Sequence, residues 1–74
     1  MNDSSEVTKI FGQRIKQLRL AKGLSQEDLG ELCSLDRTYI SSLERGHRNV
    51  SLKNIASLAK ALDVTLSELF EGIE

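Results

Sequence analysis

Apolar residues recur along this chain at spacings of three and four, the period of a helix that buries one face. No segment alternates apolar and polar residues for long enough to form a strand, and the chain contains no proline. The pattern therefore predicts an all-α fold. We expect five short helices, over residues 6–22, 26–33, 37–45, 52–62 and 66–71.

Residues that favour helix ends divide the chain at the same places. Four N-cap candidates precede helical patterns: Ser25, Asp36, Ser51 and Thr65. Thr65 is followed by Glu68, the spacing of a capping box. Gly23 and Gly46 are expected to close the preceding helices, because glycine adopts the left-handed conformation at no steric cost.

The apolar faces predict one core, in a compact single domain over residues 1–74. Its expected members are Phe11, Ile15, Leu18, Leu29, Leu32, Cys33, Ile40, Leu43, Ile55, Leu58, Ala59 and Leu62. The predicted linkers are too short for a second domain. Cys33 shares the inward arc with Leu29, so we interpret it as a small core residue and not as a redox or metal residue.

The composition excludes several classes of protein. With 74 residues, 39% hydrophobic and 28% charged, the chain is an ordinary globular sequence whose small core favours oligomerisation. One cysteine allows no internal disulfide, and no Cys/His spacing fits zinc. We find no nucleophile paired with a base, no phosphate loop and no apolar run that spans a membrane. We expect a cytoplasmic protein that is not an enzyme, with no cofactor and no small-molecule substrate.

Charge is distributed unevenly, although the net charge is only -1. The first 24 positions hold five basic residues, Lys9, Arg14, Lys16, Arg19 and Lys22, which we expect to be mostly a solvated face of the first helix. Residues 61–74 carry four acidic residues and no basic one. The net charge argues against a general polycation that coats nucleic acid.

Residues 26–45 have the organisation of a helix-turn-helix unit, since only Ser34, Leu35 and Asp36 separate two short predicted helices. The positions that this unit buries are Leu29, Leu35, Ile40 and Leu43. Gly30 faces the other helix, where a small side chain lets the two backbones approach closely. Several independent constraints thus agree on the motif.

The second helix of this unit presents a polar arc, formed by Arg37, Thr38, Ser41, Ser42 and Arg45. Arg37 can donate two parallel hydrogen bonds to guanine O6 and N7, and Thr38 and Ser41 are short enough for close entry into a major groove. We predict that Arg37, Thr38, Ser41 and Ser42 read bases. The alternative is an ordinary solvated face, on which Arg37 pairs with Asp36 or Ser41.

Three stretches resemble a known family: FGQRIKQLRLAKGLSQEDLGEL, LDRTYISSLERGHRNVSLKNIASLAKAL and TLSELF. They are similar to the lambda-repressor-like, phage-repressor type of DNA-binding domain, and most similar to the controller proteins of restriction-modification systems. The resemblance implies a compact five-helix domain that binds a pseudo-palindromic operator as a dimer and regulates transcription. Ser34 departs from the family, which often has glycine in this turn, at a cost of about 1 kcal/mol.

The resemblance also implies contacts with the DNA backbone, for which the candidates are Ser25, Gln26, Tyr39, Arg45, Arg48 and Asn49. Gln26 stands at a helix N-terminus, where the family meets a phosphate, and a simple capped turn is the alternative. Tyr39 lies between the polar and buried arcs, so packing and phosphate contact both stay open. His47, the only histidine, is interpreted as a surface residue.

The last predicted helix has more apolar surface than sealing the core requires: Leu66, Leu69, Phe70 and Ile73. Because related proteins dimerise through their last helices, we expect a homodimer through residues 62–74. The alternative is that Phe70 folds back onto the core.

Acidic residues of the second predicted helix have two interpretations. Glu27 and Asp28 favour the positive end of the helix dipole, which is a stabilising role. Alternatively, Glu27 and Glu31 contact RNA polymerase, as in related repressor-activators. Rival functions for the whole chain are a prophage or antitoxin-type repressor and a helical protein-interaction module.

Overall fold

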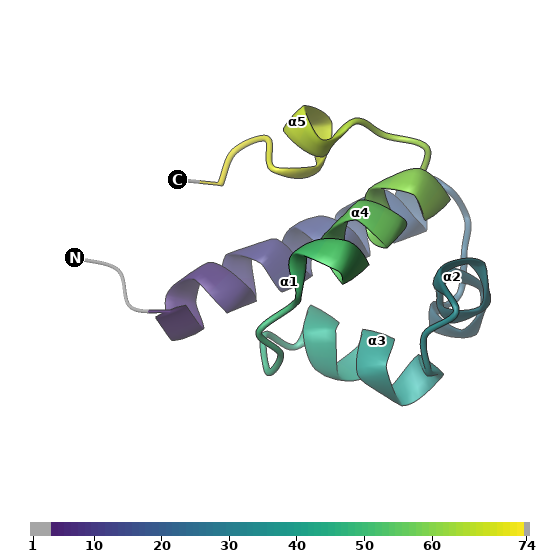
Figure 1. Ribbon diagram of the computed structural model, residues 1–74, viewed down its shortest axis with the longest axis horizontal. Coiled ribbons are helices and arrows are strands. Elements are labelled where there is room, and N and C mark those ends of the chain that lie inside the picture. Colours follow the sequence, from purple (N-terminus) through teal and green to yellow (C-terminus); the bar gives the residue numbers. More distant parts are fainter. Residues whose placement is uncertain (1–3, 74) are drawn as a thin grey trace.

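The computed structural model describes residues 4–73, and all regular structure in that range is helical (Figure 1). The helices are α1 (Ser4–Ala21), α2 (Gln26–Cys33), α3 (Arg37–Glu44), α4 (Leu52–Ala61) and α5 (Leu66–Leu69). This confirms the all-α, five-helix prediction, with every expected boundary within two residues of the observed one. No helix between residues 4 and 73 is long and apolar enough to cross a membrane.

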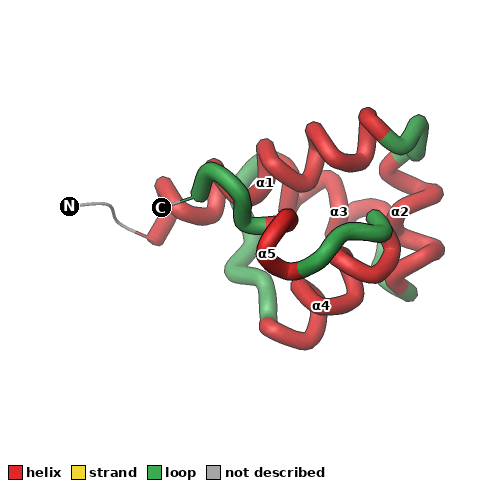
Figure 2. The backbone as a smooth tube through the Cα atoms, turned by 90° about the horizontal axis from the view of Figure 1, so that it is seen from above, coloured by secondary structure: helices red, strands yellow, loops and turns green. Residues whose placement is uncertain are grey.

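The longest helix, α1, runs along the molecule, with α4 in front of it in this view and α2 and α3 grouped at one edge (Figure 1). α5 lies on the side of α4 away from α3, and the segment after it turns back toward the first half of α1 (Figure 2). α2 packs against both α3 and α4, while α1 packs against α3. The predicted helix-turn-helix pair, α2 and α3, is therefore supported by α4 on one side and by α1 on the other.

The predicted helix ends are confirmed. The side chains of Ser25, Asp36, Ser51 and Thr65 each accept a hydrogen bond from a first-turn backbone N–H. Reciprocal bonds complete capping boxes with Asp28 and Glu68, and the bonds from the cap residues lower the pKa of both carboxyl groups. Gly23 and Gly46 have positive φ, as expected.

The core contains nine buried apolar residues: Phe11, Ile15, Leu29, Ile40, Leu43, Leu58, Ala59, Leu62 and Leu69. All of them except Leu69 were predicted as core members. Three further predicted members, Leu18, Cys33 and Ile55, are half-buried and pack against this core. Leu32 was assigned wrongly, because its side chain is 59% exposed. Its neighbour Cys33 lies on the face of α2 that meets α4. Leu32 lies at the edge of that face, so its side chain points toward solvent.

A close approach between α1 and the end of α3 was not predicted. A Cβ atom on Gly12 would lie 2.4 Å from the carbonyl oxygen of Leu43 and 2.8 Å from that of Glu44. One turn earlier in α1, the Thr8 hydroxyl donates to the carbonyl oxygen of Gly46 over 2.9 Å. The backbone of α1 therefore lies directly against the C-terminal turn of α3.

Gly12→Ala tests this close approach. The methyl group would overlap two backbone oxygens of α3, so we expect the free energy of unfolding to fall by about 1–3 kcal/mol or more. Urea denaturation followed by circular dichroism measures the change. Gln13→Ala, at the exposed neighbouring position, is the matched control and should change stability by less than about 0.5 kcal/mol. Equal stability of the two variants would contradict the packing described.

Candidate nucleic-acid interface

The turn between α2 and α3 brings the two helices together at Gly30. A Cβ atom there would lie 2.6 Å from the carbonyl oxygen of Leu35, so no larger side chain fits. The N–H of Leu35 donates to the carbonyl oxygen of Gly30 over 2.8 Å. Ser34 adopts the left-handed conformation with φ 59°, as expected for this position in the turn. The predicted helix-turn-helix geometry is confirmed.

The polar arc predicted on α3 lies on its outer face. Arg37 and Thr38 are exposed, and Ser41 and Ser42 are half-exposed. On the opposite face, Ile40 and Leu43 are buried in the core. Asp36 caps the helix through the N–H of Thr38, and Arg37 has no ion pair with another residue in the described part of the chain. The Arg37 guanidinium is therefore available to a ligand.

Tyr39 packs between α3 and α4. The guanidinium carbon of Arg48 lies 5.0 Å from the centre of its ring, a cation–π contact. The side-chain amide of Asn54 donates to the Tyr39 hydroxyl oxygen over 3.3 Å, which leaves the hydroxyl hydrogen for another acceptor. The packing role considered for Tyr39 is thus confirmed, and its contact with phosphate stays a prediction.

The first turn of α2 is held by its cap and by a bond to α3. The Ser25 hydroxyl accepts from the N–H of Asp28 over 2.9 Å, and the Asp28 carboxylate accepts from the N–H of Ser25 over 3.0 Å. Gln26 follows, with its side-chain nitrogen 3.1 Å from Glu44 Oε1. Both residues proposed for the N-terminus of α2 are therefore in fixed positions.

Arg19 corrects the prediction that the basic residues of the first helix form a solvated face. It is only 7% exposed, and its Nε and Nη2 donate to the two oxygens of Glu44 over 2.6 and 3.0 Å. Its Nη1 donates to the carbonyl oxygen of Leu24 over 2.9 Å. The hydrogen bonds that Arg19 donates to the Glu44 carboxylate raise the pKa of Arg19.

The sequence analysis missed Glu44, which is also 7% exposed. The available signal was its position four residues after Ile40 and next to Leu43, which places a carboxylate on the buried face of α3. A charge at such a position requires a buried partner. Arg14 also departs from the solvated-face prediction, since its Nη2 donates to the carbonyl oxygen of Glu68 and ties α5 to α1.

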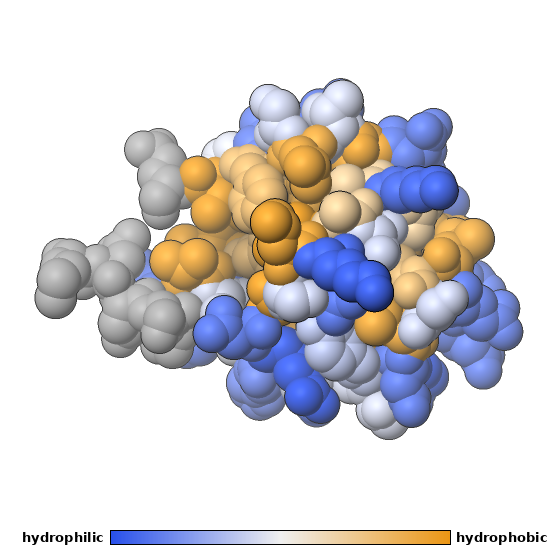
Figure 3. Space-filling view, viewed as in Figure 1, coloured by the Kyte–Doolittle hydropathy of each residue, from blue (hydrophilic) through white to orange (hydrophobic). Residues whose placement is uncertain are grey.

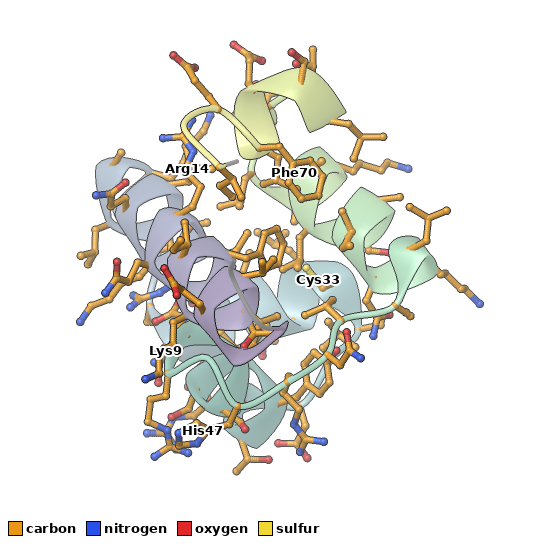
Figure 4. All side chains as sticks on the ribbon, turned by 90° about the vertical axis from the view of Figure 1, so that its left-hand side faces the viewer. Lys9, Arg14, Cys33, His47 and Phe70 are labelled. Carbon is orange, nitrogen blue, oxygen red and sulfur yellow. The ribbon has the colours of Figure 1, made fainter. Side chains whose placement is uncertain are left out.

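The remaining polar candidates are at the α3 end of the molecule. Arg45, Arg48 and Asn49 are exposed, and so is His47. Figure 4 shows side chains bearing nitrogen gathered around His47, with Lys9 close by on α1. This edge is therefore rich in hydrogen-bond donors, although the whole chain has a net charge of -1. Among residues 4–73, no group of acidic, histidine or cysteine side chains could hold a metal ion.

Apolar side chains gather near α5 and the segment that follows it (Figure 3). Leu66 is 46% exposed, and Phe70 is 38% exposed although its ring stacks on Phe11 at 5.5 Å between centroids. A groove of about 130 Å³ runs beside them, lined by Val7, Phe11, Val50, Ile55, Phe70 and Ile73 together with polar residues.

The prediction that Leu69 belongs to the dimer interface is wrong. Leu69 is fully buried and seals the core, because the turn of α5 points this residue inward while Leu66 stays outside. It therefore cannot contact a partner. The alternative for Phe70 is correct in part, since the ring folds back onto Phe11 and still leaves one surface exposed. The half-buried Ile73 borders the same groove.

Comparison with known proteins places this geometry in a family. Residues 15–69 match a family model described as helix-turn-helix. The chain is 48% identical to the control protein C.BamHI of Bacillus amyloliquefaciens over 69 residues, which cover 92% of this chain and 85% of that protein. It is 52% identical to the control protein C.MunI of a Mycoplasma species, over 86% of this chain and 88% of the relative.

A solved structure is similar along its entire length. The crystal structure of the restriction-modification controller protein C.AhdI from Aeromonas hydrophila superposes with a TM-score of 0.89 at 55% identity. The match covers 93% of this chain and 100% of that one. The arrangement of the five helices is therefore shared with a controller protein.

Proposed function

Because the chain belongs to the helix-turn-helix family and, within it, to the restriction-modification control proteins, we propose that it regulates a restriction-modification system by binding a pseudo-palindromic operator as a dimer. The observation that carries this proposal is the outer face of α3. It presents polar side chains that are exposed or half-exposed, while its inner face is packed against α1 and α2.

Base recognition is assigned to the start and middle of α3. Arg37 is exposed in the first turn, where a recognition helix approaches base edges, and its guanidinium suits guanine O6 and N7. Thr38, Ser41 and Ser42 follow on the same face, and their short side chains allow the helix to lie deep in the major groove.

Phosphate contacts are assigned to groups around the edges of α3. Ser25 and Gln26 stand at the N-terminus of α2, where backbone N–H groups and the helix dipole favour an anion. On the other side, Arg45, Arg48 and Asn49 are exposed, and Tyr39 has a hydroxyl hydrogen to donate. Such contacts set the register of the protein on DNA, whereas the bases supply specificity.

Arg37→Ala and Arg48→Ala should separate base reading from backbone binding. Loss of a bidentate contact to guanine should cost about 1–3 kcal/mol per half-site on operator DNA and little on random DNA. Loss of Arg48 should weaken both complexes and reduce the salt slope by about one unit. Fluorescence anisotropy at several salt concentrations measures both effects. Equal loss on operator and random duplexes for Arg37→Ala would contradict its assignment.

Dimerisation is assigned to the apolar surface formed by Leu66, Phe70 and Ile73, with Val7 beside it. A chain of 74 residues has a small core, so covering this surface with a second copy adds stability as well as bivalency. A two-fold dimer would present two copies of α3 to major grooves about 34–36 Å apart.

Leu66→Ser and Leu69→Ala should have different effects, because one residue is exposed and the other is buried. Leu66→Ser should shift sedimentation at micromolar concentration toward the monomer and keep the helical circular dichroism spectrum. Leu69→Ala should lower the free energy of unfolding by about 2–5 kcal/mol through a cavity. A wild-type protein that sediments as a monomer at tens of micromolar would refute the dimer.

Activation is assigned to the acidic surface of α2, where Glu27 and Glu31 are exposed. We infer that these side chains meet a basic surface of RNA polymerase when the protein is on DNA. Asp28 is excluded from this role because its carboxylate completes the cap of α2. Electrostatic complementarity of this kind mainly speeds and orients association.

Glu31→Gln tests the contact with polymerase. The change removes a charge from the surface without altering the cap or core, so operator affinity should stay the same while transcription from an activated promoter falls. In vitro transcription with purified polymerase measures the effect, with Lys60→Gln on exposed α4 as a surface control. Full activation by the Glu31 variant would refute the assigned contact between Glu31 and the polymerase.

A further inference from the structure

Glu44 connects the buried ion pair to the first residue of α2. One of its oxygens, Oε2, accepts from Arg19 Nε over 2.6 Å. The other, Oε1, accepts from Arg19 Nη2 over 3.0 Å and from Gln26 Nε2 over 3.1 Å. A single carboxylate at the end of α3 therefore holds a cation from α1 and an amide from α2.

The chemistry of the amide explains what this bond can do. An amide nitrogen has two hydrogens, and the contact with Glu44 uses one of them. The second remains available to a phosphate oxygen in front of α2. Arg19 balances the charge of Glu44, so the carboxylate can lie behind this position with little repulsion of an anion.

We propose that Glu44 is a positioning residue for DNA binding, which holds the Gln26 side chain at the start of α2 so that its free N–H meets a backbone phosphate. This inference rests on the proposed DNA-binding function and names a residue that does not itself touch DNA. A side chain that is held before binding loses less conformational freedom in the complex. The ion pair is then a support for the interface as well as part of the core.

The test replaces the pair by Arg19→Met together with Glu44→Met. Apolar replacement of a whole buried ion pair preserves folding better than loss of one partner, and this double change keeps the net charge at -1. The probe is a duplex selected from random-sequence DNA by the wild-type protein. We expect the affinity for this duplex to fall about three- to tenfold, and Gln26→Ala to cause a similar loss.

The combination of all three changes is decisive. If Glu44 acts through Gln26, the triple variant should bind no more weakly than Gln26→Ala alone. Additive losses, or an unchanged affinity of the Arg19→Met, Glu44→Met protein, would overturn the proposal. Leu58→Val, a core change in α4 remote from Gln26, controls for a general loss of stability and should leave the affinity unchanged.

A second measurement needs no variant. In the free wild-type protein, nitrogen relaxation of the Gln26 side-chain amide should show restricted motion before DNA is added. A freely rotating amide would overturn the proposal even if the variants do not fold. Failure of the wild-type protein to select any duplex would refute the DNA-binding function itself, which distinguishes that outcome from failure of the positioning role alone.

Discussion

The buried ion pair between Arg19 and Glu44 joins the three helices on which the proposed interface depends. Removing two charges from water is expensive, and the attraction between them offsets that cost only when the geometry is good and the remaining polar atoms are bonded. Both conditions are met, because the contact is bidentate and the carbonyl oxygen of Leu24 and the amide of Gln26 satisfy further groups. Since such pairs add little net stability, we interpret this one as selecting a single arrangement of α1, α2 and α3. Helices of eight residues cannot hold an orientation by themselves.

The geometry of that pair depends in turn on glycine in α1. Gly12 and Arg19 are seven residues apart, about two helical turns, so they lie on the same face of α1 with the buried Ile15 between them. Gly12 admits the carbonyl oxygens of Leu43 and Glu44, which brings the end of α3 against this face. The same contact therefore buries the end of α3 and places the carboxylate of Glu44 beside the guanidinium of Arg19. The outer face of α3 takes no part in this packing, so its side chains can change with the operator while the fold is preserved.

Most of the fold could be predicted from the sequence because it depends on local signals. Caps, left-handed glycines and the helical period act within a few residues, and they located every helix to within two positions. The polar arc of α3 follows from the same period. The errors concern contacts between distant residues. Arg19 was expected in solvent because its partner is 25 positions away, Leu32 was misplaced because periodicity does not define the width of a buried face, and Leu69 depends on how α5 turns back. The contact of Gln26 with Glu44 likewise could not be predicted from local patterns, because the two residues are 18 positions apart.

The C-terminal segment couples stability to assembly. Leu69 fills the core from inside, whereas Leu66, one turn earlier, faces solvent, and Phe70 both stacks on Phe11 and keeps an exposed surface. Arg14 fastens this segment to α1 through the carbonyl oxygen of Glu68. A second copy that covers Leu66 and Phe70 would therefore also stabilise the closure of the core beneath them, since binding to the folded state alone shifts the folding equilibrium. In the other direction, DNA that holds two copies of α3 raises the effective concentration of the two apolar surfaces. In the proposed dimer, folding, dimerisation and operator binding would thus be linked through the same short segment.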